Sequence, residues 1–290
     1  MKTTLKIKLG LKYLCVLLYM GFSQMTNAAE VQFTTRSYIQ GNDALTDLKI
    51  SDEGYLLVMR GDVMDVGMSG AGIFAGRLSD SDRQGLNSAA TEAKKYPGFT
   101  PAPLIDKYVR AFFESGERLA KLDATINLEP KDNKILVSVS FVNTGSKDIC
   151  FKSPSTWEGY FNPINGSSWI RVSGILGGTQ GKETGQRIQT AEFGGAEMFN
   201  AKDYVNDVIC IARNEIKVAK FLVFPKGVIR KGTYTVGASI VIREVMEPKE
   251  FNHGLEFFSI NQTIDFPRDY PSTPEEISAF AAYLKTQPQE

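Results

Sequence analysis

The fold class of this chain of 290 residues is decided by residues 135–151, which read ILVSVSFVNTGSKDICF. Apolar side chains recur at every second position of its first half, at Ile135, Val137, Val139 and Phe141. A period of two places these side chains on one face of a strand, so the run predicts a strand with one buried face. The polar NTGS segment that follows predicts a turn, and ICF predicts the start of another strand.

The same pattern continues on both sides of this run. Upstream, Ala124, Ile126 and Leu128 alternate with polar residues, and residues 130–133 (PKDN) predict a turn that leads into residue 135. Downstream, short apolar runs predict further strands at 208–212, 218–224, 233–245 and 255–266. About seven short strands with turns between them are typical of an antiparallel β-sandwich.

Residues 135–151, together with the run IRKGTYTVGASIVI at 229–242, resemble the immunoglobulin-like sandwich domains of exported bacterial proteins. In that family an NTG-type turn joins early strands, and a KGTY-type segment begins a late strand. The resemblance covers residues 122–267 and implies a fold but no activity, because these domains share no functional residues. It also implies positions for Cys150 and Cys210 from which they could bridge facing sheets.

Residues 29–121 predict a small α+β domain. A DEG turn separates Leu48 and Ile50 from residues 55–59 (YLLVM), which predicts a hairpin, and residues 73–75 (IFA) predict a third strand. Ser79 predicts the N-cap of a helix that ends before residue 97.

The segment 101–122 fits two structures. The spacing of Ile105, Tyr108, Val109 and Phe112 fits a helix, whereas the ESGE turn at 114–117 between two apolar runs fits a hairpin. Turn chemistry, and the need of a three-stranded sheet for partners, favour the hairpin.

The last residues, 268–290, predict a tail with a short helix. Thr273 precedes Pro274 and lies three residues before Glu276, which is the pattern of a capping box. One apolar stripe follows, formed by Ile277, Phe280, Ala281 and Leu284. This stripe predicts that the helix packs on the chain's own core.

The first 28 residues predict a cleavable signal peptide. A positively charged start is followed by an apolar run at 13–22 that is too short to span a bilayer. Small residues at Thr26 and Ala28 predict cleavage after Ala28, so we expect a periplasmic or secreted chain that begins near Ala29, without a membrane span. Loss of four lysines leaves 29 basic against 33 acidic residues, and this charge of −4 argues against nucleic acid as a partner.

Cysteine usage fits the same compartment. Cys15 leaves with the signal peptide, so Cys150 and Cys210 remain. An even number in an oxidising compartment predicts a disulfide between them. The alternative is two separate buried thiols, which behave as small apolar side chains.

The residue types present argue against several kinds of catalytic and metal-binding site. The chain has one histidine, His253, so a multi-histidine metal site is excluded and a Ser-His-Asp triad would have to use it. Its FNHGL setting predicts a surface turn. The GMSGA run at 67–71 lacks the last glycine of a nucleophile elbow, and the RGD tripeptide at 60–62 is interpreted as turn material. We therefore expect no catalytic residues, no metal and no cofactor.

Residues 153–200 hold both tryptophans and many glycines, and predict a long loop of the kind that often carries function. We expect Trp157, Tyr160 and Phe161 to form a recognition surface. Residues 169–172 (WIRV) alternate as a strand does, so we expect Trp169 to lie in the core. The pattern leaves open whether Trp157 is exposed.

These features predict an exported, non-enzymatic binding or interaction protein of the bacterial periplasm, with another envelope protein as its partner. An inhibitor or immunity protein against an envelope-targeting toxin is a specific form of this prediction. One alternative is a module that binds carbohydrate or envelope polymer, which requires Trp157 and Tyr160 exposed in one plane. Another is a hydrolase that uses carboxylates alone.

Overall fold

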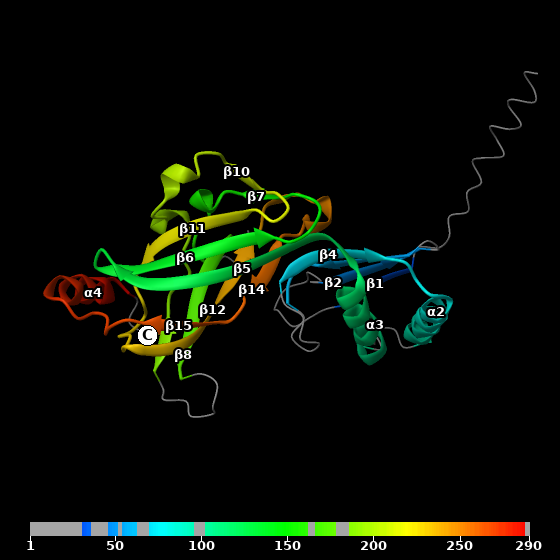
Figure 1. Cartoon of the computed structure of the whole chain (residues 1–290), viewed down its shortest axis with the longest axis horizontal. Coiled ribbons are helices and arrows are strands. Elements are labelled where there is room, and N and C mark those ends of the chain that lie inside the picture. Colours follow the sequence, from blue (N-terminus) through cyan, green and yellow to red (C-terminus); the bar gives the residue numbers. More distant parts are fainter. Residues whose placement is uncertain are drawn as a thin grey trace, which may run out of the picture.

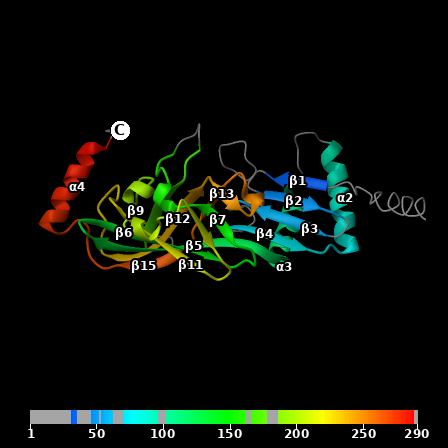
Figure 2. The same cartoon turned by 90° about the horizontal axis from the view of Figure 1, so that it is seen from above.

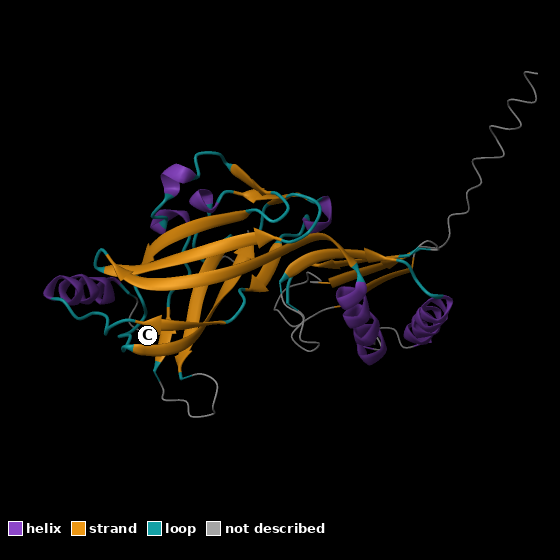
Figure 3. Cartoon of the chain, in the orientation of Figure 1, coloured by secondary structure: helices purple, strands orange, loops and turns teal. Residues whose placement is uncertain are grey.

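The computed structural model describes residues 31–35, 46–51, 54–62, 70–95, 102–161, 166–177 and 186–287. These residues form a mainly β protein with three antiparallel sheets and a C-terminal helix (Figure 1, Figure 3). The predicted signal peptide, residues 1–28, lies outside the described residues. No described helix is both long and apolar enough to cross a membrane.

The largest sheet has seven strands, and the first six follow one another in sequence as a meander. In spatial order they are β1 (Val31–Thr35), β2 (Thr46–Ile50), β3 (Tyr55–Met59), β4 (Ala71–Gly76), β5 (Glu117–Lys131), β6 (Lys134–Asn143) and β11 (Ile216–Val223). The predicted hairpins β2–β3 and β5–β6 are confirmed. Asp132 and Asn133 make the second turn with φ of 48° and 63°, a conformation that asparagine and aspartate tolerate best.

Two further sheets complete the larger part of the molecule. The five-stranded sheet contains β14 (Leu255–Phe258), β12 (Gly232–Ile242), β8 (Trp169–Leu176) and β9 (Arg187–Gln189), with β15 (Gln262–Phe266) also paired to β12. The small sheet contains β10 (Val208–Ile211), β7 (Ile149–Lys152) and β13 (Val245–Glu247). Four 3-10 turns join these strands: η2 (Pro154–Thr156), η3 (Gly195–Glu197), η4 (Ala201–Asp203) and η5 (Lys249–Phe251).

Part of the segment predicted as a long loop is regular secondary structure. β8 lies inside it and pairs with β12 along eight residues, so the prediction of an irregular loop over 153–200 is wrong. The strand-like alternation at residues 169–172 is confirmed, but Gly174 hid the full length of the strand; a Cβ at this position would lie 3.0 Å from Val236. Trp169 begins the strand and is 7% exposed, as predicted.

The predicted disulfide between Cys150 and Cys210 is present. It joins directly opposed residues of β7 and β10, which are neighbours in the small sheet. The implied bridge between facing sheets is therefore wrong, because both cysteines belong to one sheet.

Residues 102–115 form a helix, α3 (Ala102–Ser115), so the predicted hairpin over 101–121 is wrong. Val109 and Phe112 lie one helical turn apart and are both buried, and Phe112 stacks on Tyr55 of β3 with ring centroids 3.8 Å apart. Gly116 does not turn a hairpin: its N–H donates to the carbonyl of Phe112 at 2.8 Å and ends the helix. The helical apolar period therefore outweighed the local turn signal.

α2 (Asp80–Lys95) begins where the sequence predicted, with the N–H of Asp82 donating to Ser79 Oγ at 3.1 Å. Side chains of α2 and α3 cover one face of β2–β4 and form the smaller core. It consists of Leu48, Ile50, Tyr55, Leu57, Met59, Phe74, Leu86, Val109 and Phe112.

The larger core lies between β5, β6 and β11 on one side and β12 and β8 on the other. β3 contributes to both cores, because Leu57 faces the helices while Val58 belongs to the larger core. β5 also runs through position 122, where the sequence predicted a boundary between an α+β domain and a sandwich. That division stays a prediction.

The C-terminal helix, α4 (Pro274–Thr286), has the predicted capping box of Thr273 and Glu276. Phe280 is buried in the larger core, which confirms packing on the chain's own body. The predicted apolar stripe is divided, since Ile277 and Leu284 are 53% and 46% exposed. Figure 2 shows α4 at the end of the molecule opposite α2.

Candidate functional site

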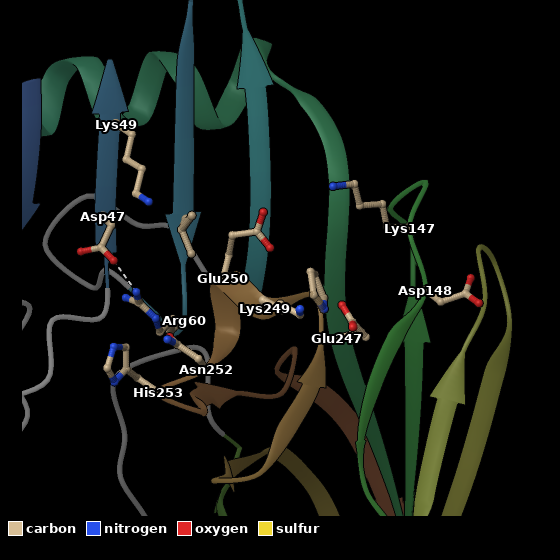
Figure 4. Close-up of a pocket in the computed structure, with 12 residues that line it drawn as sticks. Asp47, Lys49, Arg60, Lys147, Asp148, Glu247, Lys249, Glu250, Asn252 and His253 are labelled. Atoms are coloured by element: carbon tan, nitrogen blue, oxygen red, sulfur yellow. Dashed lines mark hydrogen bonds and ion pairs between the residues drawn. The ribbon is translucent and has the colours of Figure 1, made fainter. Parts of the chain in front are cut away.

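A cleft of about 750 Å³ lies where the β2–β3 hairpin meets the chain that follows β13. Figure 4 shows its side chains arriving from that hairpin, from the loop before β7 and from the segment around η5. The lining residues are Asp47, Lys49, Val58, Arg60, Lys147, Asp148, Glu247, Pro248, Lys249, Glu250, Asn252 and His253. We call this site the charged cleft.

An ion pair between a buried arginine and a partly buried aspartate forms the floor of the charged cleft. Arg60 follows the last residue of β3, is 6% exposed and pairs with Asp47 of β2. The backbone fixes its position, because the Arg60 carbonyl accepts the N–H of Glu256 in β14 at 2.8 Å. Removing one partner of a buried ion pair leaves an uncompensated charge, so this pair is a fixed element of the site.

Behind this floor, Asp62 ties the two parts of the molecule together. Its carboxylate accepts the N–H of Gly70, which precedes β4, and the N–H of Phe258 at the end of β14. Burial raises the pKa of Asp62, while the two backbone hydrogen bonds and nearby Lys121 act in the opposite direction. Gly70 has φ of +84°, and a Cβ there would lie 2.4 Å from Lys121 Nζ, so the junction requires glycine.

The rim of the charged cleft carries exposed side chains of both signs. Lys147 and Lys249 alternate with Asp148 and Glu247, and all four are solvent-exposed. A rim of mixed charge complements a ligand that carries charges of both signs. It differs from typical small-molecule sites, which are lined mostly by apolar and aromatic side chains.

His253 lies in the exposed turn that follows η5, as the sequence predicted. Among the described residues that line the charged cleft, none is a serine, threonine or cysteine that this histidine could activate. Among the residues that the structure describes, no group of three His, Cys, Asp or Glu could hold a metal ion.

The predicted recognition residues do not share one surface. Trp157 is 3% exposed, and its indole N–H donates to the carbonyl of Lys152 at 2.8 Å. Its ring packs among Phe141 and Phe151, with both centroid distances 6.2 Å. Tyr160 and Phe161 are 54% and 60% exposed, so these two remain available for contacts and Trp157 supports the core instead.

Sequence reasoning missed the charged cleft, although two of its features were visible. Arg60 and Asp62 were interpreted as turn residues of an RGD tripeptide, but both are buried at the junction. Asp47 and Arg60 flank the two arms of a predicted hairpin, and the pairing of Asp47 with Val58 brings them to the same end. Opposite charges that flank a hairpin were the available signal. No signal in the sequence pointed to Lys249 and His253, because only the tertiary fold brings them to the cleft.

Comparison of the chain with protein-family models, with curated proteins and with solved structures finds no match. Function therefore has to be argued from the site.

Proposed function

We propose that this chain is an exported, non-enzymatic binding protein of the bacterial periplasm that holds a segment of another envelope protein in the charged cleft. Two features of the cleft together support this proposal. Arg60 paired with Asp47 forms a rigid floor, and the rim exposes side chains of both charges. Fixed charges that need no rearrangement lower the cost of binding.

Two features support the proposed compartment. The first 28 residues have the charge, apolar run and small residues of a signal peptide. Cys150 and Cys210 form a disulfide, a bond that persists in oxidising compartments. Within this proposal, residues 122–267 are an immunoglobulin-like sandwich, a scaffold suited to presenting a binding surface.

A protein ligand fits the cleft better than a glycan does. Protein modules that bind sugars commonly present exposed aromatic rings, whereas no described residue that lines this cleft is aromatic. The platform of Trp157 and Tyr160 that a carbohydrate module would have needed is absent, because Trp157 is buried. Rim charges of both signs instead match the mixed charges of a protein surface.

The proposed specific form is an inhibitor or immunity protein. In this form the bound segment belongs to a secreted toxin enzyme, and the cleft blocks that enzyme outside the cytoplasm. The prediction is then that the captured partner loses catalytic activity in the complex.

The partner can be captured with a photo-crosslinking residue at Asn252, an exposed position in the lining. We expect one periplasmic protein to cross-link there and none from the same probe at Lys226, an exposed position outside the lining. A cross-link to peptidoglycan or polysaccharide instead of a protein would overturn the proposal.

Affinity for the captured partner then tests the rim. We expect Lys147→Glu with Lys249→Glu to weaken binding about tenfold, through lost charge complementarity. The matched control, Lys226→Glu with Lys285→Glu, makes the same change in net charge at exposed positions outside the cleft. Equal effects of the two double variants would show that net charge, not the cleft, controls binding.

A further inference from the structure

β10 is the edge strand of the small sheet. It pairs with β7, and no other described strand pairs with it. Figure 1 shows β10 on the outside of the molecule, beyond β7. An edge strand presents unpaired N–H and C=O groups that can pair with another chain.

Val208 and Cys210 turn their backbone groups toward this open edge. The N–H of Ser153 donates to the carbonyl of Asp207 at 2.7 Å, so these two residues form a hydrogen-bonded pair of the ladder. Such pairs alternate along antiparallel strands, so residues 209 and 211 bond to β7 while 208 and 210 face away. The 4.0 Å between the Cα atoms of Cys150 and Cys210 fits the closer, non-hydrogen-bonded position.

Two other sheet edges in the described part of the chain, those of β11 and β14, are covered. Along β11, Phe199 donates its N–H to the carbonyl of Lys220 at 2.7 Å, and Asn200 Oδ1 accepts the N–H of Lys220 at 2.8 Å. β14 is covered by residues 60–62, and β13 is short, has a register shift and precedes Pro248.

β10 itself reads VICI and contains none of the lysines, prolines or bulges that usually protect an edge. The disulfide also ties this edge covalently to β7, so it is preorganised for pairing. The edge of β10 is therefore unprotected and fixed in place, so a strand of another polypeptide can pair with it.

The edge of β10 opens into a hollow of about 560 Å³ that has apolar side chains in its lining. Val205, Val208 and Ile216 line it and are 81%, 37% and 60% exposed. Ile216 begins β11, so the edges of two sheets border the same hollow. Alternate side chains of an added strand would find apolar contacts there.

Two charged side chains line the hollow, Lys217 and Asp203. Lys217 lines it, but pairs with Glu215 at 2.5 Å. Asp203 also lines it; its carboxylate accepts a hydrogen bond from Asn200 Nδ2 at 3.3 Å, and among the described residues no lysine or arginine forms a salt bridge with it. Burial, and then the charge of Asp203, raise the pKa of Tyr204 to about 12. A positively charged ligand would therefore be favoured at Asp203.

We propose that the edge of β10 accepts an extended, basic segment of another polypeptide as a fourth strand of the small sheet. Its apolar side chains lie in the hollow, and a lysine or arginine lies beside Asp203. This site shares no lining residue with the charged cleft and does not depend on the function proposed for it.

The probe is a synthetic capped hexapeptide of sequence KVTVTK, used with a matched peptide in which glutamate replaces both lysines. We expect the lysine peptide to bind at least fivefold more tightly. On saturation, the amides of Val208 and Cys210 should exchange with solvent at least tenfold more slowly, because their N–H groups become paired. Two further peptides, N-methylated on the valines or on the threonines, identify the pairing face, since one of them should fail to bind.

Variants of Val208 separate strand pairing from simple apolar contact. Val208→Pro removes the outward N–H without removing a bond to β7, and should abolish peptide binding, whereas Val208→Thr keeps the N–H and should bind. The cleft variant Lys147→Glu with Lys249→Glu should bind the peptide as the unmodified protein does.

Three results would overturn the proposal. They are unchanged exchange at Val208 and Cys210 with saturating lysine peptide, equal binding by Val208→Pro, and self-association of the protein that Val208→Pro removes. The last would mean that a second copy occupies the edge. Amide exchange at Val208 and Cys210 of the unmodified protein still tests the proposal if Val208→Pro fails to fold.

Discussion

The two hydrophobic cores of this chain are closed in different ways. The smaller core is a sheet face covered by two helices, α2 and α3, whereas the larger core is closed by a second sheet and flanked by a disulfide. β3 and β4 contribute side chains to both cores, and the charged cleft lies at the end of the β2–β3 hairpin where Asp47 and Arg60 meet.

Because the two cores cover opposite faces of β3, they limit where a charged side chain can lie. Apolar side chains fill both faces of β3, so a charge at its end has to be paired, as Arg60 is with Asp47. The cleft therefore depends on both cores holding the junction in place. The variants below perturb one of the two cores, the junction between them or the elements that flank the larger core.

The largest effect is expected from the larger core. Phe141 is fully buried and its ring lies 5.8 Å from that of Phe151. Phe141→Ala should lower the free energy of unfolding by about 4 kcal/mol, through lost burial and a cavity. Urea denaturation measures this loss of stability.

The counterpart in the smaller core is Leu57→Ala. It should lower the free energy of unfolding by about 3 kcal/mol and speed amide exchange mainly in β2–β4 and α3. Equal acceleration in β12 would show that the two cores unfold as one unit.

The disulfide should stabilise the larger part of the molecule. Replacing Cys150 and Cys210 together by alanine should lower the free energy of unfolding by about 3 kcal/mol, because the unfolded chain loses a covalent constraint. Thermal unfolding of the variant and of the reduced protein provides the comparison. A change below about 0.5 kcal/mol would mean that the small sheet holds without the bond.

The junction should respond to loss of the Asp62 carboxylate. Asp62→Ala leaves the N–H groups of Gly70 and Phe258 without this acceptor, which should cost about 2 kcal/mol. Asp62→Asn keeps one acceptor oxygen and should cost less. If amide exchange at Phe258 is the same in both variants as in the unmodified protein, Asp62 does not hold the junction.

The smallest effect is expected at the far end, in the cap of α4. The Arg268 guanidinium, with the N–H groups of Ser272 and Thr273, lowers the pKa of Glu276 from 4.5 to about 2. A lowered carboxyl pKa gives stability that is full above pH 4.5 and lost as the pH falls toward 2. Glu276→Gln should therefore cost about 1 kcal/mol at pH 7, since Arg268 is partly solvated, and the difference should vanish near pH 2. A cost that is constant from pH 7 to pH 2 would contradict the ion pair.

The sequence predicted the fold best where one face of a strand meets water. Burial alternates over residues 122–128 of β5 and 137–143 of β6, because side chains such as Ile126, Val137 and Val139 face the core. The pattern failed at α3, where aromatic residues suit both a helix and a strand, and at β8, where glycine weakens the strand signal. The position of Trp157 was not predictable, since its contacts with Phe141 and Phe151 join separate strands.

The candidate site was less predictable than the fold. Asp47 and Arg60 belong to one hairpin and could be paired from sequence, but Lys249 and Asn252 reach the cleft from nearly 200 residues further along the chain. Only the tertiary fold brings these segments together.

The central claim, that the charged cleft is where a partner protein binds, is tested most directly by amide hydrogen exchange of the complex with the partner cross-linked at Asn252. We expect slower exchange in β2, at residues 60–62 and in the segment 247–253 when the partner is bound. Slowed exchange elsewhere in the molecule, with these three segments unchanged, would contradict the claim.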